Sequence, residues 1–264
     1  VNVTGRVVDS LSGEPIGQAS LTMAVGQWKR VELSENYDKP VVVAGPVTHN
    51  NDRPLSVRVR NVSSESFEIS MQMPCGDAEQ YKGDGSCEAS NWARETVAYL
   101  AMEEGAWELA DGTKIEAHRA EVNSVRAAMG PESDTPLSID FAHDYSEAPA
   151  VLHTVMSFRD PGWITSAVWS PSREADPPSR EGFAVALEGA EVNGTHEPET
   201  VGWIAVSRAS SSLPGTEFVS GTTASSAMGT VRGHANGCYE LAQPSFGRTP
   251  YTLVAQNSRS GGDG

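Results

Sequence analysis

A short motif centred on a proline recurs three times along this chain of 264 residues. Residues 37–44 read YDKPVVVA, residues 146–153 read SEAPAVLH and residues 247–254 read GRTPYTLV. The three prolines are separated by 109 and 101 positions. Self-similarity at a near-constant spacing is the sequence signature of repeated structural units, and it constrains the fold before any local propensity is considered.

Two further motifs keep the same order at nearly the same spacing. The stretch ETVAYLA at residues 95–101 matches ETVGWIA at residues 199–205, at an offset of 104. The motif GTKI at residues 112–115 matches GTEF 103 positions later, and GEPI at residues 13–16 resembles both. Chance similarity between β-rich stretches would not keep three motifs in order. We therefore interpret the chain as a tandem array of similar modules.

The spacing of the motifs divides the chain into two complete modules and two partial ones. We predict the tail of a preceding module at 1–25, modules at 26–120 and 121–223, and a linker with the first strands of a following module at 224–264. Because both ends carry incomplete modules, we expect a mature product or a piece of something longer.

Within each module apolar and polar residues alternate with a period of two, which is typical of strands with one buried face. Residues 57–60 read VRVR, and residues 137–142 and 183–187 alternate in the same way. Turn-forming residues separate these runs, and no stretch of a dozen residues has a convincing helical stripe. The sequence therefore predicts an all-β fold of tandem antiparallel β-sandwich modules, with about six strands each and partial modules at both ends.

Three runs are apolar on both faces rather than on one. They are residues 41–44, 97–102 and 201–206. A strand that is covered on both sides reads as a continuous apolar run, so we expect these three segments to lie centrally in their sheets.

The order of the strand motifs resembles the H-type lectin module, an antiparallel β-sandwich of snail agglutinins and of repeat-bearing surface proteins. The matching stretches cover most of both modules and are KPVVV at 39–43, VRVRNVSSESF at 57–67, VAYLA at 97–101, APAVL at 148–152, GFAV at 182–185 and VGWIA at 201–205. These are core-strand motifs, so the resemblance implies a fold more than it implies a ligand.

The agglutinins of that family bind N-acetylgalactosamine through an arginine early in the third strand and a Trp-His pair after the fourth. Here the arginine position falls near Pro54 in the first module and Ser170 in the second. The Trp-His position falls near Pro74-Cys75 and within residues 188–194. Neither module retains the set, so we expect any glycan to be bound through other residues.

The chain has three cysteines, and two of them bracket a loop. Cys75 and Cys87 flank the polar, glycine-rich residues 76–86, and a disulfide there would restrict the unfolded chain by about 3 kcal/mol. A zinc pair is less well supported, because no histidine or further cysteine falls at ligand spacing nearby. Cys238 has no obvious mate, and in an oxidising compartment we expect it to pair beyond Gly264 or with another chain.

Three glycosylation sequons agree with an oxidising, secretory setting. They begin at Asn2, Asn61 and Asn193. Each triplet arises often by chance, but together with the cysteines they predict an extracellular protein, secreted or at the cell surface.

The charge of the chain excludes some partners. Lys and Arg number 19 against 35 Asp and Glu, which gives a net charge of −16. A surface of that sign repels phosphate backbones, so we expect no nucleic-acid partner. No apolar run approaches the roughly 20 residues of a membrane-spanning helix, so we expect no membrane segment in this stretch.

Motifs for catalysis are missing from the sequence. We find no nucleophile elbow, no His-Glu-x-x-His and no phosphate-binding glycine loop. The six histidines are scattered, with no pair at ligand spacing. We therefore expect no enzyme activity and assign no catalytic, cofactor-binding or metal-binding residues.

Two loops are candidate contact sites for a ligand or partner. The cysteine-bracketed loop contains Tyr81 and Asp84, which could engage calcium or a partner; the alternative is a stapled, solvated insertion. Trp163 ends the loop DPGW at residues 160–163. An exposed tryptophan can stack on a sugar or anchor a neighbouring module, but this one could equally fold onto its own sandwich.

The sequence leaves two functions open. The first is a non-enzymatic structural or adhesive extracellular protein, with modules in series that assemble with copies of themselves or with neighbouring modules into a surface filament or appendage, such as a flagellar hair or a pilus-like fibre. The alternative is a lectin or adhesin that binds glycans through residues other than the usual H-type sugar site.

Overall fold

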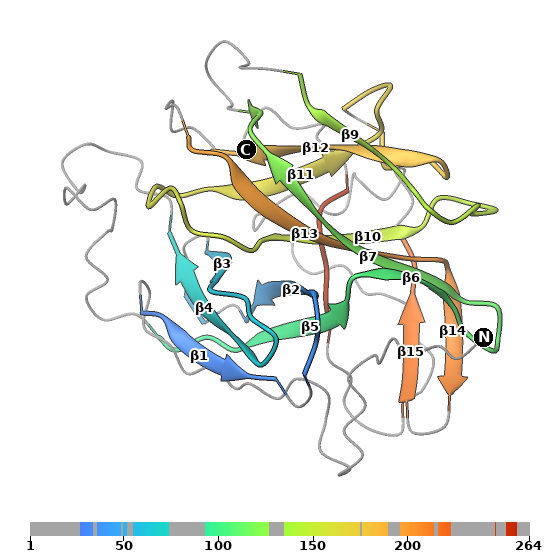
Figure 1. Ribbon diagram of the computed structural model, residues 1–264, viewed down its shortest axis with the longest axis horizontal. Helices are drawn as coiled ribbons and strands as arrows, with labels where there is room; N and C mark the ends of the chain where they lie inside the picture. Colours follow the sequence, from blue (N-terminus) through green and yellow to red (C-terminus); the bar gives the residue numbers. More distant parts are fainter. Residues whose placement is uncertain are drawn as a thin grey trace.

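The computed structural model describes most of the chain between residues 27 and 257. The residues described are 27–33, 36–48, 50–51, 55–73, 93–126, 135–174, 176–189, 196–213, 216–222, 246 and 252–257. They form 15 strands and no helix (Figure 1), and they contain no helix that is long and apolar enough to cross a membrane. The predicted all-β class with antiparallel β-sandwiches is confirmed.

The first sandwich consists of a sheet with the order β1-β4-β3 and a sheet that joins β2 to β5. The strands are β1 Lys29–Glu32, β2 Pro40–Val47, β3 Ser56–Arg60, β4 Ser66–Gln72 and β5 Val97–Glu103. Phe67 and Ile69 from one sheet and Val42 and Ala101 from the other are buried in one apolar cluster between them. This packing of two inner faces is what the period of two in the sequence requires.

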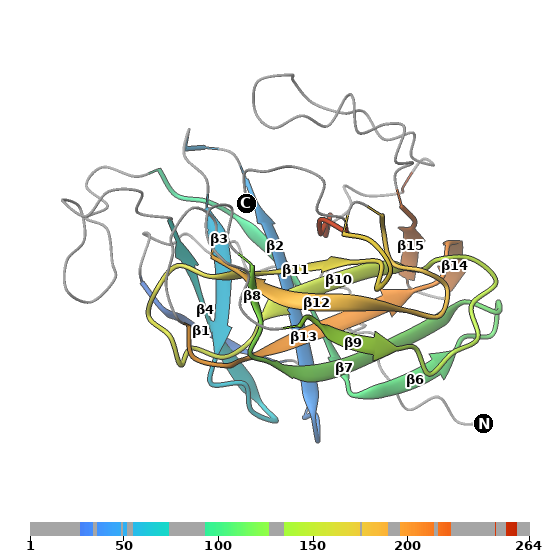
Figure 2. The same ribbon diagram turned by 90° about the horizontal axis from the view of Figure 1, so that it is seen from above.

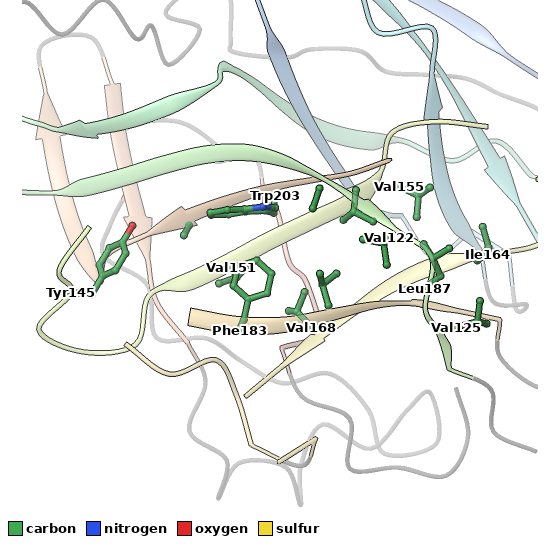
Figure 3. Close-up of a cluster of buried hydrophobic side chains, with 14 residues drawn as sticks. Val122, Val125, Tyr145, Val151, Val155, Ile164, Val168, Phe183, Leu187 and Trp203 are labelled. Atoms are coloured by element: carbon green, nitrogen blue, oxygen red, sulfur yellow. The ribbon is translucent and has the colours of Figure 1, made fainter. Parts of the chain in front are cut away.

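The second sandwich has a four-stranded sheet, β10-β13-β7-β6, packed on a sheet in which β12 lies between β11 and β8, with β9 also paired to β12. The strands are β6 Gly105–Glu108, β7 Lys114–Val122, β8 Val125–Arg126, β9 Leu137–Asp140, β10 Ala150–Val155, β11 Thr165–Trp169, β12 Gly182–Glu188 and β13 Glu199–Val206. Figure 3 shows Phe183 and Trp203 pointing toward each other across the core, with ring centroids 5.1 Å apart.

Equivalent residues of the two copies pair in the same register. Val42 lies opposite Ala101 in the first sandwich, and Val151 lies opposite Ala205 in the second. The edge pairs agree as well, because β1 meets β4 at Val31 and Phe67 whereas β9 meets β12 at Ile139 and Phe183. The repeated motifs are therefore repeated strand pairs, with β1 to β5 of the first copy matching β9 to β13 of the second.

Each copy is followed by a hairpin, and the first hairpin belongs to the sheet of the second copy. β7 pairs with β6 on one edge and with β13 on the other, over eight residue pairs from Glu199–Val122 to Val206–Ile115. The expected module boundary between 120 and 121 therefore lies inside a strand. After β13 the chain forms the corresponding hairpin from β14 (Ala209–Leu213) and β15 (Thr216–Ser220).

The two sandwiches pack on each other through a further apolar layer. The second face of β2 contributes Val41 and Val43, which cluster with Ile115 and Ala117 of β7 and Ile204 of β13. Figure 1 shows β10, β13 and β7 across the middle of the molecule with β2 and β5 below them, and Figure 2 shows β2 crossing the strands of that sheet at a steep angle. Four sheets thus enclose three apolar layers.

Of the three runs that are apolar on both faces, residues 201–206 lie centrally in their sheet as expected, in β13. The expectation was wrong for residues 41–44 and 97–102, because β2 and β5 form a sheet of only two strands among the described residues. β2 is covered on both faces, with Val41, Val42 and Val43 at most 1% exposed. β13 is central between β10 and β7, and among the described residues β5 pairs with β2 alone. In β2 the second apolar face is covered by the neighbouring sandwich. In β5, by contrast, Ala98, Tyr99 and Leu100 are only partly buried.

Two expectations drawn from the alternating pattern were wrong. Every residue of β12 is buried, although its sequence predicts one polar face. Arg58 stands on the expected polar face of β3 but is 0% exposed. The reason in the case of Arg58 is that the second sandwich covers that face, and a local period cannot reveal a neighbour about a hundred residues away.

Candidate functional site at the junction of the two sandwiches

The junction contains a fully buried ion pair with one partner from each sandwich. Nη2 of Arg58, from β3, lies 2.9 Å from Oε1 of Glu199, the first residue of β13, and both side chains are 0% exposed. A buried charge that loses its partner is strongly destabilising, so the pair makes each sandwich dependent on the other.

The other guanidinium donors of Arg58 bind the loop that follows β10. Nη2 donates to the carbonyl oxygens of Ser157 and Asp160 at 3.1 and 3.4 Å, and Nη1 donates to that of Gly162 at 3.2 Å. Nη1 also donates to Oε1 of Gln72 at 3.0 Å. Burial lowers the pKa of Arg58, and the nearby carboxylates of Glu199 and Asp160 oppose that shift. Arginine nevertheless stays protonated at neutral pH.

Glu199 holds the same loop from the other side. Its carboxylate accepts the backbone N–H groups of Arg159 and Asp160 at 3.0 and 2.9 Å, together with the hydroxyl of Ser157. The Ser157 hydroxyl in turn accepts the N–H of Thr200 at 2.7 Å. Charge-assisted hydrogen bonds of this kind are roughly twice as strong as neutral ones, so Glu199 fixes the loop conformation.

Glu95 forms the same clamp in the first sandwich. It accepts the N–H groups of Asn50 and Asn51, each at 2.9 Å, and the hydroxyl of Thr48, which accepts the N–H of Thr96. The clamp is thus a property of the repeat. The two copies differ in one further donor. The side-chain amide of Asn51 donates to Glu95, whereas the charged guanidinium of Arg58, from the other sandwich, donates to Glu199.

Aromatic rings extend the junction toward the surface. Phe158 lies 4.9 Å from the guanidinium carbon of Arg58 and meets Trp28 edge-on at a centroid distance of 4.9 Å. The guanidinium of Arg60 lies 3.9 Å over the Trp28 ring. The cation–π contact of Arg58 with Phe158 adds attraction between β3 and the loop of the second sandwich.

The backbones of β2 and of the second sandwich also come into close contact. The hydroxyl oxygen of Thr154 accepts the Ala44 N–H at 2.8 Å and lies 3.1 Å from the Ala44 carbonyl, which satisfies the edge of β2. A Cβ at Gly202 would lie 2.5 Å from Sδ of Met156 and 3.2 Å from the Val42 carbonyl oxygen. Glycine at 202 therefore permits β13 to approach β2, and the corresponding residue of the first copy is Ala98.

Trp163, a candidate contact residue, lies beside this junction and is half-buried. Its Nε1 is buried and has no hydrogen-bond partner among the described residues. In the same loop Asp160 binds Nδ1 of His196 at 2.8 Å. Burial raises the pKa of Asp160, but hydrogen bonds from the Gly162 N–H and from His196 outweigh it and leave the pKa below its ordinary value.

The remaining predicted sites are only partly covered by the described residues. Asn61 is exposed in the turn after β3, where its amide donates to Glu68 at 2.8 Å. Ser170, near the family's arginine position, is buried. The described part of the chain contains no group of three or more His, Cys, Asp or Glu side chains that could hold a metal ion. The following predicted residues lie outside the described ranges: Asn2, Pro54, Pro74, Cys75, Tyr81, Asp84, Cys87, Asn193 and Cys238.

The sequence reasoning missed the junction, although one signal for it was present. Glu95 and Glu199 begin the most similar pair of motifs, and a carboxylate directly before a buried strand needs partners of its own. Nothing in the sequence indicates that Arg58 is the partner of Glu199, because the two are brought together only by the docking of the sandwiches.

His153 of β10 links a later part of the chain to the second sandwich. Its Nδ1 lies 2.8 Å from the Ser166 hydroxyl and its Nε2 lies 3.1 Å from the Gln256 carbonyl oxygen. The side-chain amide of Asn257 brackets the edge of β10 next to it, with bonds to the N–H and the carbonyl of Val151. Burial lowers the pKa of His153 to about 4, opposed by the bond to Gln256.

We expect the folded protein to lose stability between pH 7 and pH 5 because of His153. The unfolded histidine has a pKa near 6.5, so over this range the unfolded chain takes up a proton that the folded chain does not. The expected loss in the free energy of unfolding is about 2 kcal/mol. Urea unfolding at both pH values measures it, and His153→Gln should remove most of the loss. An equal loss in wild type and variant would contradict the assignment.

Comparisons with known proteins give one weak relative. A protein named halomucin, from Haloquadratum walsbyi, is 26% identical to this chain over 227 residues. The match covers 82% of this chain but only 2% of halomucin, so the chain spans a small fraction of the length of that relative. No family model matches the chain, and no solved structure matches it.

Proposed function

We propose that this chain is a piece of a non-enzymatic structural or adhesive protein of the cell exterior, in which β-sandwich repeats are locked in series. The observation that carries the proposal is the junction, where the buried Arg58–Glu199 pair and the apolar layer around Val41 and Ile204 dock the two sandwiches directly on each other. Domains are expected to move relative to one another unless the interface between them is large and hydrophobic, and the apolar layer at this junction favours a stiff unit.

Three further observations support an exterior location. The relative that this chain resembles bears the name of a mucin, halomucin. Asn61, one of the three sequon asparagines, is exposed in a turn and could accept a glycan. The net charge of −16 suits a surface that stays hydrated and dispersed.

In the finer version of the proposal the repeats form a filament or appendage by contacts with copies of themselves or with neighbouring repeats. Negative-stain microscopy of the native material, located with an antibody against this chain, tests it. We expect elongated particles or fibres at the cell surface. Free globular particles, or label confined to the cell interior, would overturn the proposal. A glycan array, probed in the presence and absence of calcium, tests the alternative that the protein is a lectin. We expect no binding signal on the array.

A further inference from the structure

The first hairpin shows how one repeat completes the sheet of the next. β7 adds to the edge of β13, and β6 adds to β7, so that the sheet reads β10-β13-β7-β6. On this edge Trp203 lies opposite His118 and Ile204 lies opposite Ala117. Strand addition of this kind satisfies the edge through main-chain hydrogen bonds and excludes other chains from it.

The matching edge in the first sandwich has no such strand among the described residues. β5 stands in the place of β13, and β2 is its only partner within the described ranges. Tyr99 and Leu100 are half-buried, whereas the equivalent Trp203 and Ile204 are 3% and 0% exposed. An edge with partly open apolar side chains, next to backbone that no strand of the described part of the chain pairs, is a candidate for strand addition.

The sequence names one segment that fits this edge. Residues 13–16 resemble residues 112–115, which lead into β7, at an offset of 99. Residues 16–23 therefore stand where Ile115–Val122 stand in the repeat. In the register of β7 on β13, Ile16 would lie opposite Met102 and Leu21 opposite Val97, which makes two apolar cross-strand pairs.

The length of the connection agrees with this placement. Six residue steps separate Met23 from Lys29 at the start of β1. An extended chain covers about 3.5 Å per step, so it reaches about 20 Å. The two sheets of a sandwich lie about 10 Å apart, so the chain can leave the edge of β5 and enter β1 in the opposite sheet.

We propose that the edge of β5 is a strand-acceptor site and that residues 16–23 of this chain occupy it, in the register in which β7 occupies the edge of β13. Each repeat then lends its last hairpin to the sheet of the repeat that follows. β14 and β15 form the hairpin that the second repeat offers to a β5-type strand of the next one. Val219 of β15, one of two large apolar side chains exposed in the described residues, belongs to that offered strand.

A disulfide scan of the full chain tests the proposal. Ser20 would lie opposite Ala98, as Arg119 lies opposite Gly202, so we expect the variant Ser20→Cys/Ala98→Cys to form a 20–98 disulfide under mild oxidation. The matched control is Ala19→Cys/Ala98→Cys, because a shift of one residue places the side chain on the other face of the sheet. We expect cross-linking at least tenfold slower in the control. Peptide mapping separates the new bond from any bond of the native cysteines.

Two cross-linking results would overturn the proposal. The first is equal cross-linking in the two variants, and the second is a 20–98 bond that joins two different chains. Hydrogen exchange on the unmodified protein provides a readout that needs no variant. We expect slow exchange of the amides in residues 16–23, and exchange at the rate of an open chain would also overturn it. Neither measurement depends on where the protein works, so a failure here leaves the extracellular proposal standing.

Discussion

Replacing Arg58 by alanine is expected to lower the free energy of unfolding by about 3–5 kcal/mol. The substitution leaves the Glu199 carboxylate buried without its charge partner and leaves three carbonyl oxygens of the loop after β10 without their donor. Arg58→Lys keeps the charge but not the planar fork, so we expect an intermediate loss. Guanidinium unfolding followed by tryptophan fluorescence measures all of these values.

Arg60 provides the matched control on the same strand. It pairs with Glu68 at 2.7 Å and stacks on Trp28, but its side chain is 30% exposed. An exposed ion pair and one cation–π contact together account for about 1–2 kcal/mol, so Arg60→Ala should cost clearly less than Arg58→Ala. Equal losses in the two variants would mean that burial at the junction is not what gives Arg58 its effect.

Replacing the glutamate that holds the loop, Glu95 or Glu199, should lower the free energy of unfolding more in the second sandwich than in the first. Glu95→Ala leaves the N–H groups of Asn50 and Asn51 and the Thr48 hydroxyl without their acceptor, which amounts to about 1–3 kcal/mol. Glu199→Ala removes the same kind of clamp and in addition leaves Arg58 as an unpaired buried charge. We expect the loss in the free energy of unfolding to be larger in Glu199→Ala than in Glu95→Ala by about 2 kcal/mol or more.

The comparison of the two glutamates isolates the contribution of the junction because the positions are equivalent in the repeat. The double variant Arg58→Ala/Glu199→Ala completes a cycle with the two single variants. We expect the double variant to cost much less than the sum of the single losses, because either single substitution already breaks the pair. Additive losses would contradict a direct interaction between the two side chains.

The repeat motifs predicted strands and their correspondence between the two copies, but not which strands pair. Pro40 and Pro149 mark the start of equivalent strands, the ETV motifs mark a second equivalent set, and the structure joins them as β2–β5 and β10–β13. The correspondence is visible in the sequence because a motif kept in two copies reports a local environment that both copies share.

Contacts between the copies were not predictable in this way. The motif at residues 112–115 is repeated, but the repetition indicates only that a strand follows the motif. It does not indicate that this strand, β7, pairs with β13 of the next copy. Arg58 looks like a surface residue because alternation assigns it to the solvent face. Its counterpart in the second copy is Ala167, so a residue that acts at one junction leaves no repeated signal.

The most direct test of the account measures the distance between the two sandwiches in solution. Spin labels at Arg30 in β1 and Arg180 before β12 both lie on exposed side chains, and incorporation as unnatural amino acids leaves the cysteines untouched. If the junction locks the repeats together, pulsed electron–electron double resonance will give one narrow distribution of the distance between the two labels. This distribution should broaden in the variant Arg58→Ala. A broad distribution in the unmodified sequence would contradict a rigid array.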